Sequence, residues 1–179
     1  VRIYQYNNNS WSQLGADIDG EAADDASGIS ISLSSDGSRV AIGAYRNDGN
    51  GSNSGHVRIY DYNGSAWVQV GADIDGEAAG DYSGYSVSLS SDGSRVAIGA
   101  NSNDGNGTNS GHVRIYDYNG SAWAQVGADI DGEAASNYSG WKVSLSPDGS
   151  RVAIGATNNN GNGTNSGHVR IYGYNGSAW

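Results

Sequence analysis

The sequence lacks cysteine, methionine and phenylalanine, and it contains a single proline. Without cysteine the chain can form no disulfide, no zinc–thiolate site and no thiol nucleophile. No stretch reaches the roughly 18 continuous apolar residues that a membrane span needs, so no membrane insertion is expected. Apolar residues make up 36% of the chain, below the roughly 45–50% of ordinary globular domains. Any core must therefore be built from Val, Ile, Leu, Ala, Tyr and Trp.

Positive charge is also scarce. Nine Lys and Arg residues stand against 19 Asp and Glu residues, which gives a formal net charge of −10. Nucleic-acid affinity comes mainly from Lys and Arg side chains that displace counterions from phosphate. The composition therefore excludes nucleic acid as a partner.

What the sequence has in abundance is repetition. The string VRIY begins at Val1, Val57, Val113 and Val169, at intervals of 56 residues. A fixed period of this length is typical of proteins built from stacked structural units. We divide the chain into repeat 1 (1–56), repeat 2 (57–112), repeat 3 (113–168) and the start of repeat 4 (169–179).

Each repeat contains four candidate strands and no helix pattern. In the third repeat the candidates are residues 112–118, 122–130, 141–146 and 151–156, all rich in β-branched or aromatic residues. The Asn119-Gly120 pair predicts a type I′ hairpin turn between the first two. Four short antiparallel strands per repeat predict an all-β fold of β-propeller-type blades.

The faces of these strands favour stacking of the blades. In residues 85–90, Tyr85, Val87 and Leu89 alternate with three serines, so one face is bulky and the other small. Bulky faces could nest against small faces of the next blade, although a two-layer sandwich with its serines in water remains an alternative. Propellers have typically four to eight blades, so three and a fraction repeats predict an incomplete ring or an open array.

The chain resembles the FG-GAP repeat of integrin α-type propellers. The resemblance rests on SGYSVSLSSDGSRVAIGA (83–100) followed by GHVRIYDY (111–118), and it recurs along the whole chain. Ser83 replaces the family's Phe and Asn101 its Pro, while the family's calcium hairpin is shortened to Ser91-Asp92-Gly93. Calcium binding at that hairpin is therefore not expected. SPDGSRVAIG (146–155) resembles TolB-type propellers, which implies the same architecture.

An acidic stretch, GADIDGEAA, occurs unchanged in each repeat. Its carboxylates alternate along an extended chain and could form part of a calcium cage, since calcium takes six to eight oxygen ligands. The competing interpretation is structural: charge protects an edge strand from pairing, and Asp-Gly turns the chain toward the next blade. We favour the structural role. The candidate calcium ligands are Asp17, Asp19, Glu21, Asp73, Asp75, Glu77, Asp129, Asp131 and Glu133.

Other polar residues are weaker candidates. The loop at 103–111 offers a single carboxylate, and turn formation is the favoured role. His56, His112 and His168 occur once per repeat, and equivalent copies around an array do not make the single converging triad of a hydrolase. We expect them to form hydrogen bonds at the base of the loop. The Tyr and Trp residues either supply the core or contact protein or carbohydrate.

We therefore predict a non-enzymatic, extracellular or cell-surface repeat scaffold for adhesion or assembly, whose copies could join head to tail into a filament. Its partners would be other copies of itself or the remaining repeats of a longer chain. The alternative is a calcium-dependent propeller module that binds glycan or protein ligands. No cofactor is expected to be required, and calcium is the one ion considered.

Overall fold

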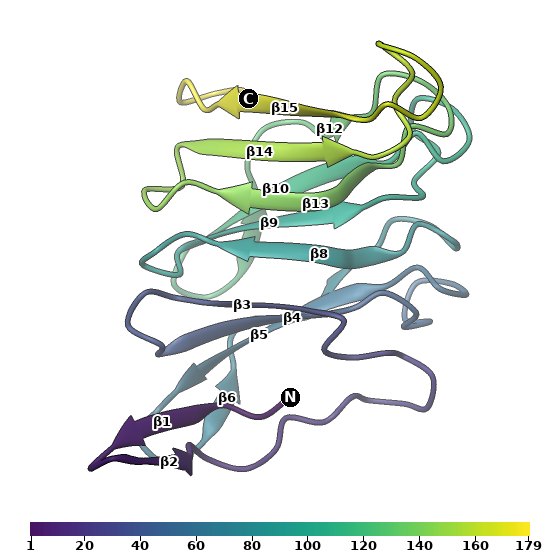
Figure 1. The fold of residues 1–179 in the computed structure, drawn as a ribbon. Coiled ribbons are helices and arrows are strands. Elements are labelled where there is room, and N and C mark those ends of the chain that lie inside the picture. Colours follow the sequence, from purple (N-terminus) through teal and green to yellow (C-terminus); the bar gives the residue numbers. More distant parts are fainter.

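The computed structural model describes all 179 residues and contains strands but no helix (Figure 1). The structure therefore has no helix long and apolar enough to cross a membrane. The strands are β1 (Tyr4–Asn7), β2 (Ser10–Gln13), β3 (Ser30–Leu33), β4 (Arg39–Ala44), β5 (His56–Tyr62), β6 (Trp67–Gln69), β7 (Ile74–Asp75), β8 (Ser83–Leu89), β9 (Arg95–Ala100), β10 (His112–Tyr118), β11 (Trp123–Gln125), β12 (Ile130–Asp131), β13 (Ser139–Leu145), β14 (Arg151–Ala156) and β15 (His168–Gly173).

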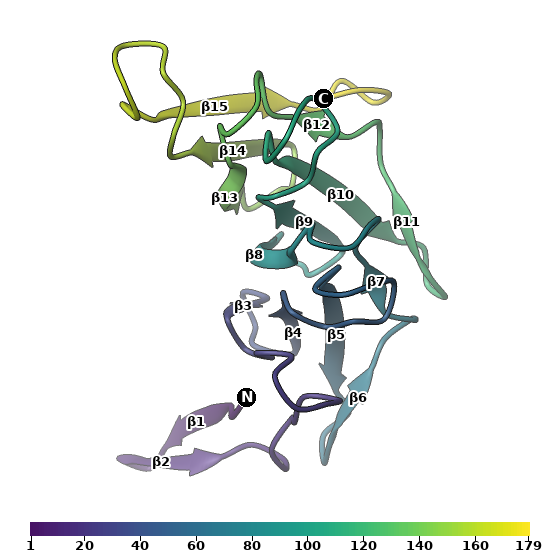
Figure 2. The ribbon, with the colours of Figure 1, turned by 90° about the vertical axis from the view of Figure 1, so that its right-hand side faces the viewer.

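The strands form antiparallel sheets that follow one another in chain order, with the two termini at opposite ends (Figures 1 and 2). Strands β3–β4–β5–β6 form one complete blade, and β8–β9–β10–β11 form the next. The short strands β7 and β12 add to the outer side of β5 and β10. Hairpin β1–β2 precedes these blades, and β13–β14–β15 follow them. The predicted all-β array of propeller-type blades is confirmed, and it does not close.

Each complete blade draws on two successive repeats. Strands β3 and β4 lie in repeat 1, whereas β6 lies in repeat 2 and β5 crosses the boundary between them. The hairpin β1–β2 corresponds by position to the two outer strands of a blade, and β13–β14–β15 correspond to the three inner ones. The chain therefore presents two unlike end faces.

Two local predictions are wrong. The segment predicted as one strand, 122–130, is divided into β11 and β12 by a bend at Gly127, where φ is +76°. The turn after β10 is not type I′, because Gly120 alone has a positive φ while Asn119 does not. Instead the Asn119 side chain accepts hydrogen bonds from the backbone N–H groups of Ser121 and Ala122. A side-chain acceptor thus replaces the backbone conformation that Asn-Gly usually favours.

The bulky face of each blade nests against the small face of the preceding one. Ala41, Val57 and Ile59 of the first blade form one buried cluster with Val87, Leu89, Val96, Ile98 and Tyr116 of the second. The same arrangement joins the second blade to the third through Ala97, Val113, Ile115, Leu145, Val152 and Ile154. This confirms the predicted stacking and excludes the two-layer sandwich.

Backbones approach closely at the inner edge of each interface. A Cβ on Gly99 would overlap the carbonyl oxygen of Gly140 in the next blade and lie 3.0 Å from its carbonyl carbon. Beside this contact, Ser86 Oγ accepts a hydrogen bond from Val143 N at 2.9 Å. Ser88 Oγ does the same for Leu145 N at 3.0 Å. The serines therefore satisfy N–H groups on the free edge of the inner strand, which would otherwise be exposed to pairing.

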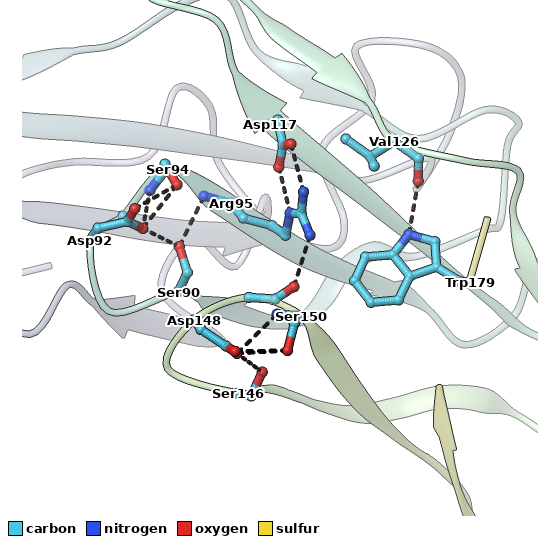
Figure 3. Close-up of polar contacts among 12 residues, drawn as sticks. Ser90, Asp92, Ser94, Arg95, Asp117, Val126, Ser146, Asp148, Ser150 and Trp179 are labelled. Atoms are coloured by element: carbon cyan, nitrogen blue, oxygen red, sulfur yellow. Dashed lines mark hydrogen bonds and ion pairs between the residues drawn. The ribbon is translucent and has the colours of Figure 1, made fainter. Parts of the chain in front are cut away.

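An arginine on the second strand of each complete blade, Arg39 or Arg95, links the outer parts of neighbouring blades. Arg95 forms a bidentate ion pair with Asp117 at 2.6 and 2.7 Å, and its third nitrogen donates to Gly149 O in the next blade (Figure 3). The guanidinium also lies 5.5 Å from the Trp179 ring centroid. Trp179 Nε1 in turn donates to Val126 O at 2.9 Å (Figure 3). Trp179 therefore belongs to the packing between blades.

Candidate functional site

The acidic stretch of each repeat lies where the chain leaves one blade for the next. Ile74 and Asp75 form β7, which pairs with β5 alone, as the edge-strand interpretation predicts. Asp73 precedes β7, and Glu77 follows it on the segment that crosses to β8. The three carboxylates of one copy consequently separate: Asp73 lies beside His56 of its own blade, and Glu77 beside His112 of the next.

Acids from successive copies meet at the histidines instead. Glu21 and Asp73 converge on His56, and Glu77 and Asp129 converge on His112. Glu133 lies 3.7 Å from His168 Nδ1. The remaining four candidate ligands are engaged differently. Asp17 binds the Arg2 and Gln13 side chains, while Asp19, Asp75 and Asp131 each accept an arginine hydrogen bond at the backbone carbonyl.

We call each meeting of a histidine with acids of successive copies a histidine joint, and the first is formed by Glu21, His56 and Asp73. His56 Nδ1 lies 3.7 Å from Glu21 Oε2 and 3.7 Å from Asp73 Oδ2. The other oxygen of each carboxylate is already engaged. Glu21 Oε1 faces Arg58 Nη1 at 3.5 Å, and Asp73 Oδ1 accepts from Gln69 Nε2 at 2.6 Å. The two free oxygens therefore point toward one imidazole nitrogen.

The second joint repeats this arrangement. His112 Nδ1 lies 3.7 Å from Glu77 Oε2 and 3.6 Å from Asp129 Oδ2. Arg114 Nη1 approaches Glu77 Oε1 at 3.6 Å, and Gln125 Nε2 donates to Asp129 Oδ1 at 2.6 Å. The duplicated geometry follows from the duplicated sequence, because all five residue types recur at the same spacing.

The expected hydrogen bonds of the histidines are not formed. The side chains of His56 and His112 are each 1% exposed, and their Nε2 atoms have no hydrogen-bond partner. Burial lowers the pKa of both imidazoles, and Arg114 adds to the effect at His112. Burial acts this way because it disfavours the charged form. Each imidazole is therefore held neutral beside two carboxylates.

The shortened hairpin does not fit calcium. Asp92 Oδ1 accepts hydrogen bonds from Ser90 Oγ at 2.6 Å and from Ser94 N at 3.0 Å, and Ser94 Oγ also binds the carboxylate (Figure 3). The single carboxylate is thus used to close the turn between β8 and β9. Calcium needs six to eight oxygens, and this hairpin offers no second acid.

The Asn-rich loop between β9 and β10 is likewise stabilised by its own side chains. Asp104 Oδ1 accepts from Asn109 N at 2.7 Å, and Asn103 Oδ1 accepts from Gly105 N at 2.8 Å. Asn106 Nδ2 donates to the carbonyl of Gly132 at 2.8 Å, which ties the loop to the crossing segment. These contacts agree with the turn role that the sequence favoured.

The two end faces expose residues that are buried between blades elsewhere in the chain. Val169 and Ile171 are 66% and 71% exposed, whereas their equivalents Val113 and Ile115 are 0% and 2% exposed. A hollow of about 560 Å³ lies on this C-terminal face. At the other end Ile29, Ile31 and Leu33 are exposed, although Val87 and Leu89 at the equivalent positions of Ile31 and Leu33 are buried.

Comparison with known proteins assigns the chain to a family. The family described as FG-GAP repeat matches residues 16–60 and 72–116, just over half of the chain. The chain belongs to the FG-GAP repeat family. Each FG-GAP match runs from an acidic stretch to the third strand of the following blade, ending in β5 or β10.

No curated protein matches the sequence. Among solved structures, the chain is similar to Kuenenia stuttgartiensis hydrazine synthase, with 14% identity and a TM-score of 0.49. That match covers 89% of this FG-GAP chain and 35% of the other protein's chain. The present chain therefore spans about a third of the length of that relative.

Sequence reasoning missed the meeting of acids and histidines. It grouped Asp73, Asp75 and Glu77 by their nearness along the chain, whereas the blade interface sorts them between two histidines. A signal was available in the sequence, because each histidine directly precedes a VRI string and holds a fixed place in the repeat. The inter-blade bond from Arg95 to Gly149 O had no comparable signal, since the partner is a backbone carbonyl.

Proposed function

We propose that this chain is a non-enzymatic scaffold for adhesion or assembly at an extracellular or cell-surface location. Its complementary end faces carry the proposal. The C-terminal face is the small face that receives a blade elsewhere in the chain, and the N-terminal face contains the bulky residues that such a face receives. A second copy of this chain can therefore continue the stacking without any new kind of contact.

The type of interface determines what would assemble. Because the two faces differ, the contact is heterologous, and such contacts build rings when the rotation closes and filaments when it does not. Further repeats of the same kind within one longer chain would use the same two faces. Membership of the FG-GAP family and the acidic, cysteine-free composition support the proposed location.

The test compares two exposed positions. Ile171→Glu places a charge on the C-terminal face, and Val68→Glu places the same charge at an exposed position of β6, the outermost strand of the first complete blade. We expect the unmodified chain and V68E to associate with rising concentration, measured by light scattering after gel filtration. I171E should remain monomeric at the same concentrations. A monomeric unmodified chain, or an I171E variant that associates normally, would overturn the proposal.

A second candidate is a calcium-dependent module that binds glycan or protein ligands. The observation in its favour is a hollow of about 220–250 Å³ that occurs three times, each time between an acidic stretch and a Tyr and a Trp of the outer strands. The middle one is lined by Asp73, Asp75, Tyr116 and Trp123, among others, and aromatic rings with polar tips suit carbohydrate contact. A ligand that binds the folded state raises Tm. Equal Tm values in chelator and in millimolar calcium would remove this candidate.

A further inference from the structure

We propose that the two complete histidine joints, Glu21–His56–Asp73 and Glu77–His112–Asp129, are binding sites for a divalent transition metal of the zinc class. In each joint the ligand atoms lie within 4.8 Å of one another. The proposal concerns single chains and goes beyond the assembly role, since none of the six ligands is among the exposed apolar residues that define the end faces.

The orientation of the carboxylates is the first support. A carboxylate in water can rotate freely, whereas here Asp73 Oδ1 accepts a hydrogen bond from Gln69, and Glu21 Oε1 forms an ion pair with Arg58 at 3.5 Å. The remaining oxygens face His56 Nδ1 from two sides at 3.7 Å, beyond hydrogen-bond distance. Hydrogen bonds that orient ligating groups in this way are a general feature of metal sites.

The buried histidine is the second, independent support. His56 is almost wholly buried and forms no side-chain hydrogen bond, with Nδ1 directed at the carboxylates and Nε2 unpartnered. Burying a polar group without a partner is costly. A metal bound at Nδ1 would supply that atom's missing partner.

The ligand set selects the class of ion. Zinc binds nitrogen and oxygen ligands at about 2.0–2.2 Å, which places tetrahedral ligand atoms about 3.4 Å apart. The two distances from Nδ1 to the carboxylate oxygens, 3.7 Å each, are close to this value, and all three ligand atoms lie within 4.8 Å of one another, so side-chain rotations would complete the site. Calcium instead prefers six to eight oxygens, and each joint offers two carboxylates and one nitrogen. Three protein ligands leave a position for water, as in other three-ligand zinc sites.

The charge of the site also suits a divalent cation. Two carboxylates and the nearby Arg58 leave a net charge of −1 around the neutral imidazole, so a divalent ion would bring the group to +1. Glu21 lies on the segment that enters the blade, whereas His56 and Asp73 belong to the blade itself. A bound ion would therefore clamp the crossing segment to the next blade.

The third joint provides an internal contrast. Glu133 lies 3.7 Å from His168 Nδ1, but its Oε2 already accepts a hydrogen bond from Asn159 Nδ2 at 3.1 Å. No second carboxylate completes the group. The stoichiometry expected for this chain is therefore two ions.

The experiment titrates zinc into the metal-free protein by calorimetry and repeats the titration with cobalt, whose visible absorption reports nitrogen and oxygen coordination. We expect two ions per unmodified chain, one in E21Q and none in E21Q/E77Q. E133Q is the matched control and should retain both. Glu→Gln preserves size at half-exposed positions, and circular dichroism checks that each variant is folded.

Using the I171E background separates this test from the assembly proposal, because a monomeric chain should still bind two ions. A tenfold excess of calcium should not displace zinc. The proposal is overturned if the unmodified chain binds no zinc, if E21Q/E77Q still binds two ions, or if calcium takes both sites in preference.

Discussion

Substituting one interface glycine with alanine, and the equivalent glycine at the open end, tests how closely the blades pack. Gly99 lies between two blades, whereas Gly155 occupies the same place in the next repeat on the uncovered C-terminal face. An added Cβ at Gly99 would overlap Gly140 O in the adjacent strand β13. At Gly155 the nearest atom outside the neighbouring residues is Lys142 O at 3.7 Å, an ordinary contact. Neither glycine has a positive φ, so steric overlap alone distinguishes them.

The cost at Gly99 follows from the contacts around it. The new Cβ would overlap the Gly140 carbonyl oxygen and lie 3.0 Å from its carbonyl carbon, so β13 must retreat by roughly 1 Å or more to reach an unstrained spacing. That movement stretches the two hydrogen bonds from Val143 N and Leu145 N to the serines of β8. Overpacking costs about 1–3 kcal/mol, and each hydrogen bond contributes about 1 kcal/mol. We therefore expect G99A to lose about 2–4 kcal/mol of unfolding free energy.

The assay is thermal and urea unfolding followed by circular dichroism for both variants under identical conditions. For a chain of this size, G99A should lower Tm by about 5–12 °C. G155A should leave Tm unchanged or raise it slightly, since replacing glycine restricts the unfolded chain. Equal Tm values for G99A and G155A would refute the reasoning, because they would mean that the blades do not approach at Gly99.

Two further predictions concern the blade-linking arginine and the hairpin aspartates. R95M should lose about 1–3 kcal/mol of unfolding free energy, because it removes the Asp117 pair and the bond to Gly149 O. R151M should be near neutral because Arg151 has no such partners. Equal losses of the two variants in urea unfolding would contradict this. Hydrogen bonds from neighbouring serines lower the pKa of Asp36 and Asp148 to about 2. These folded-state pKa values lie below the ordinary Asp pKa of ~3.9 that applies to the unfolded chain. The stabilisation from these hydrogen bonds is therefore fully present above about pH 4 and is lost as the pH falls through about 2. Carboxyl titration by NMR checks this, and ordinary Asp pKa values for both residues would refute it.

Much of the fold could be predicted from residue patterns. The strand at 112–118 was predicted with its observed bounds because its alternation and β-branched content are local properties. The nesting of Val87 and Leu89 on a small-residue face also followed from the period of two along a strand. The bend at Gly127 was missed, since the apolar pattern continues through it and the Trp179 side chain that it packs against lies far along the chain.

The candidate metal joints were predicted only in part. Asp73 and Glu77 were recognised as candidates, but their histidine partners were not, because proximity along the chain suggested that the acids would bind together. In the structure they lie on opposite sides of a crossing between blades. Which residues of successive repeats meet depends on how far one blade is rotated and shifted relative to the next.

The sequence by itself determined the repeating unit, its antiparallel strands and the difference between its two faces, because each of these depends on residues close together along the chain. The tertiary structure decided which glycine meets which carbonyl, which serine satisfies which free edge, and that Glu21 shares His56 with Asp73. Those pairings arise where backbones from separate repeats pack against each other, and no local pattern encodes that distance.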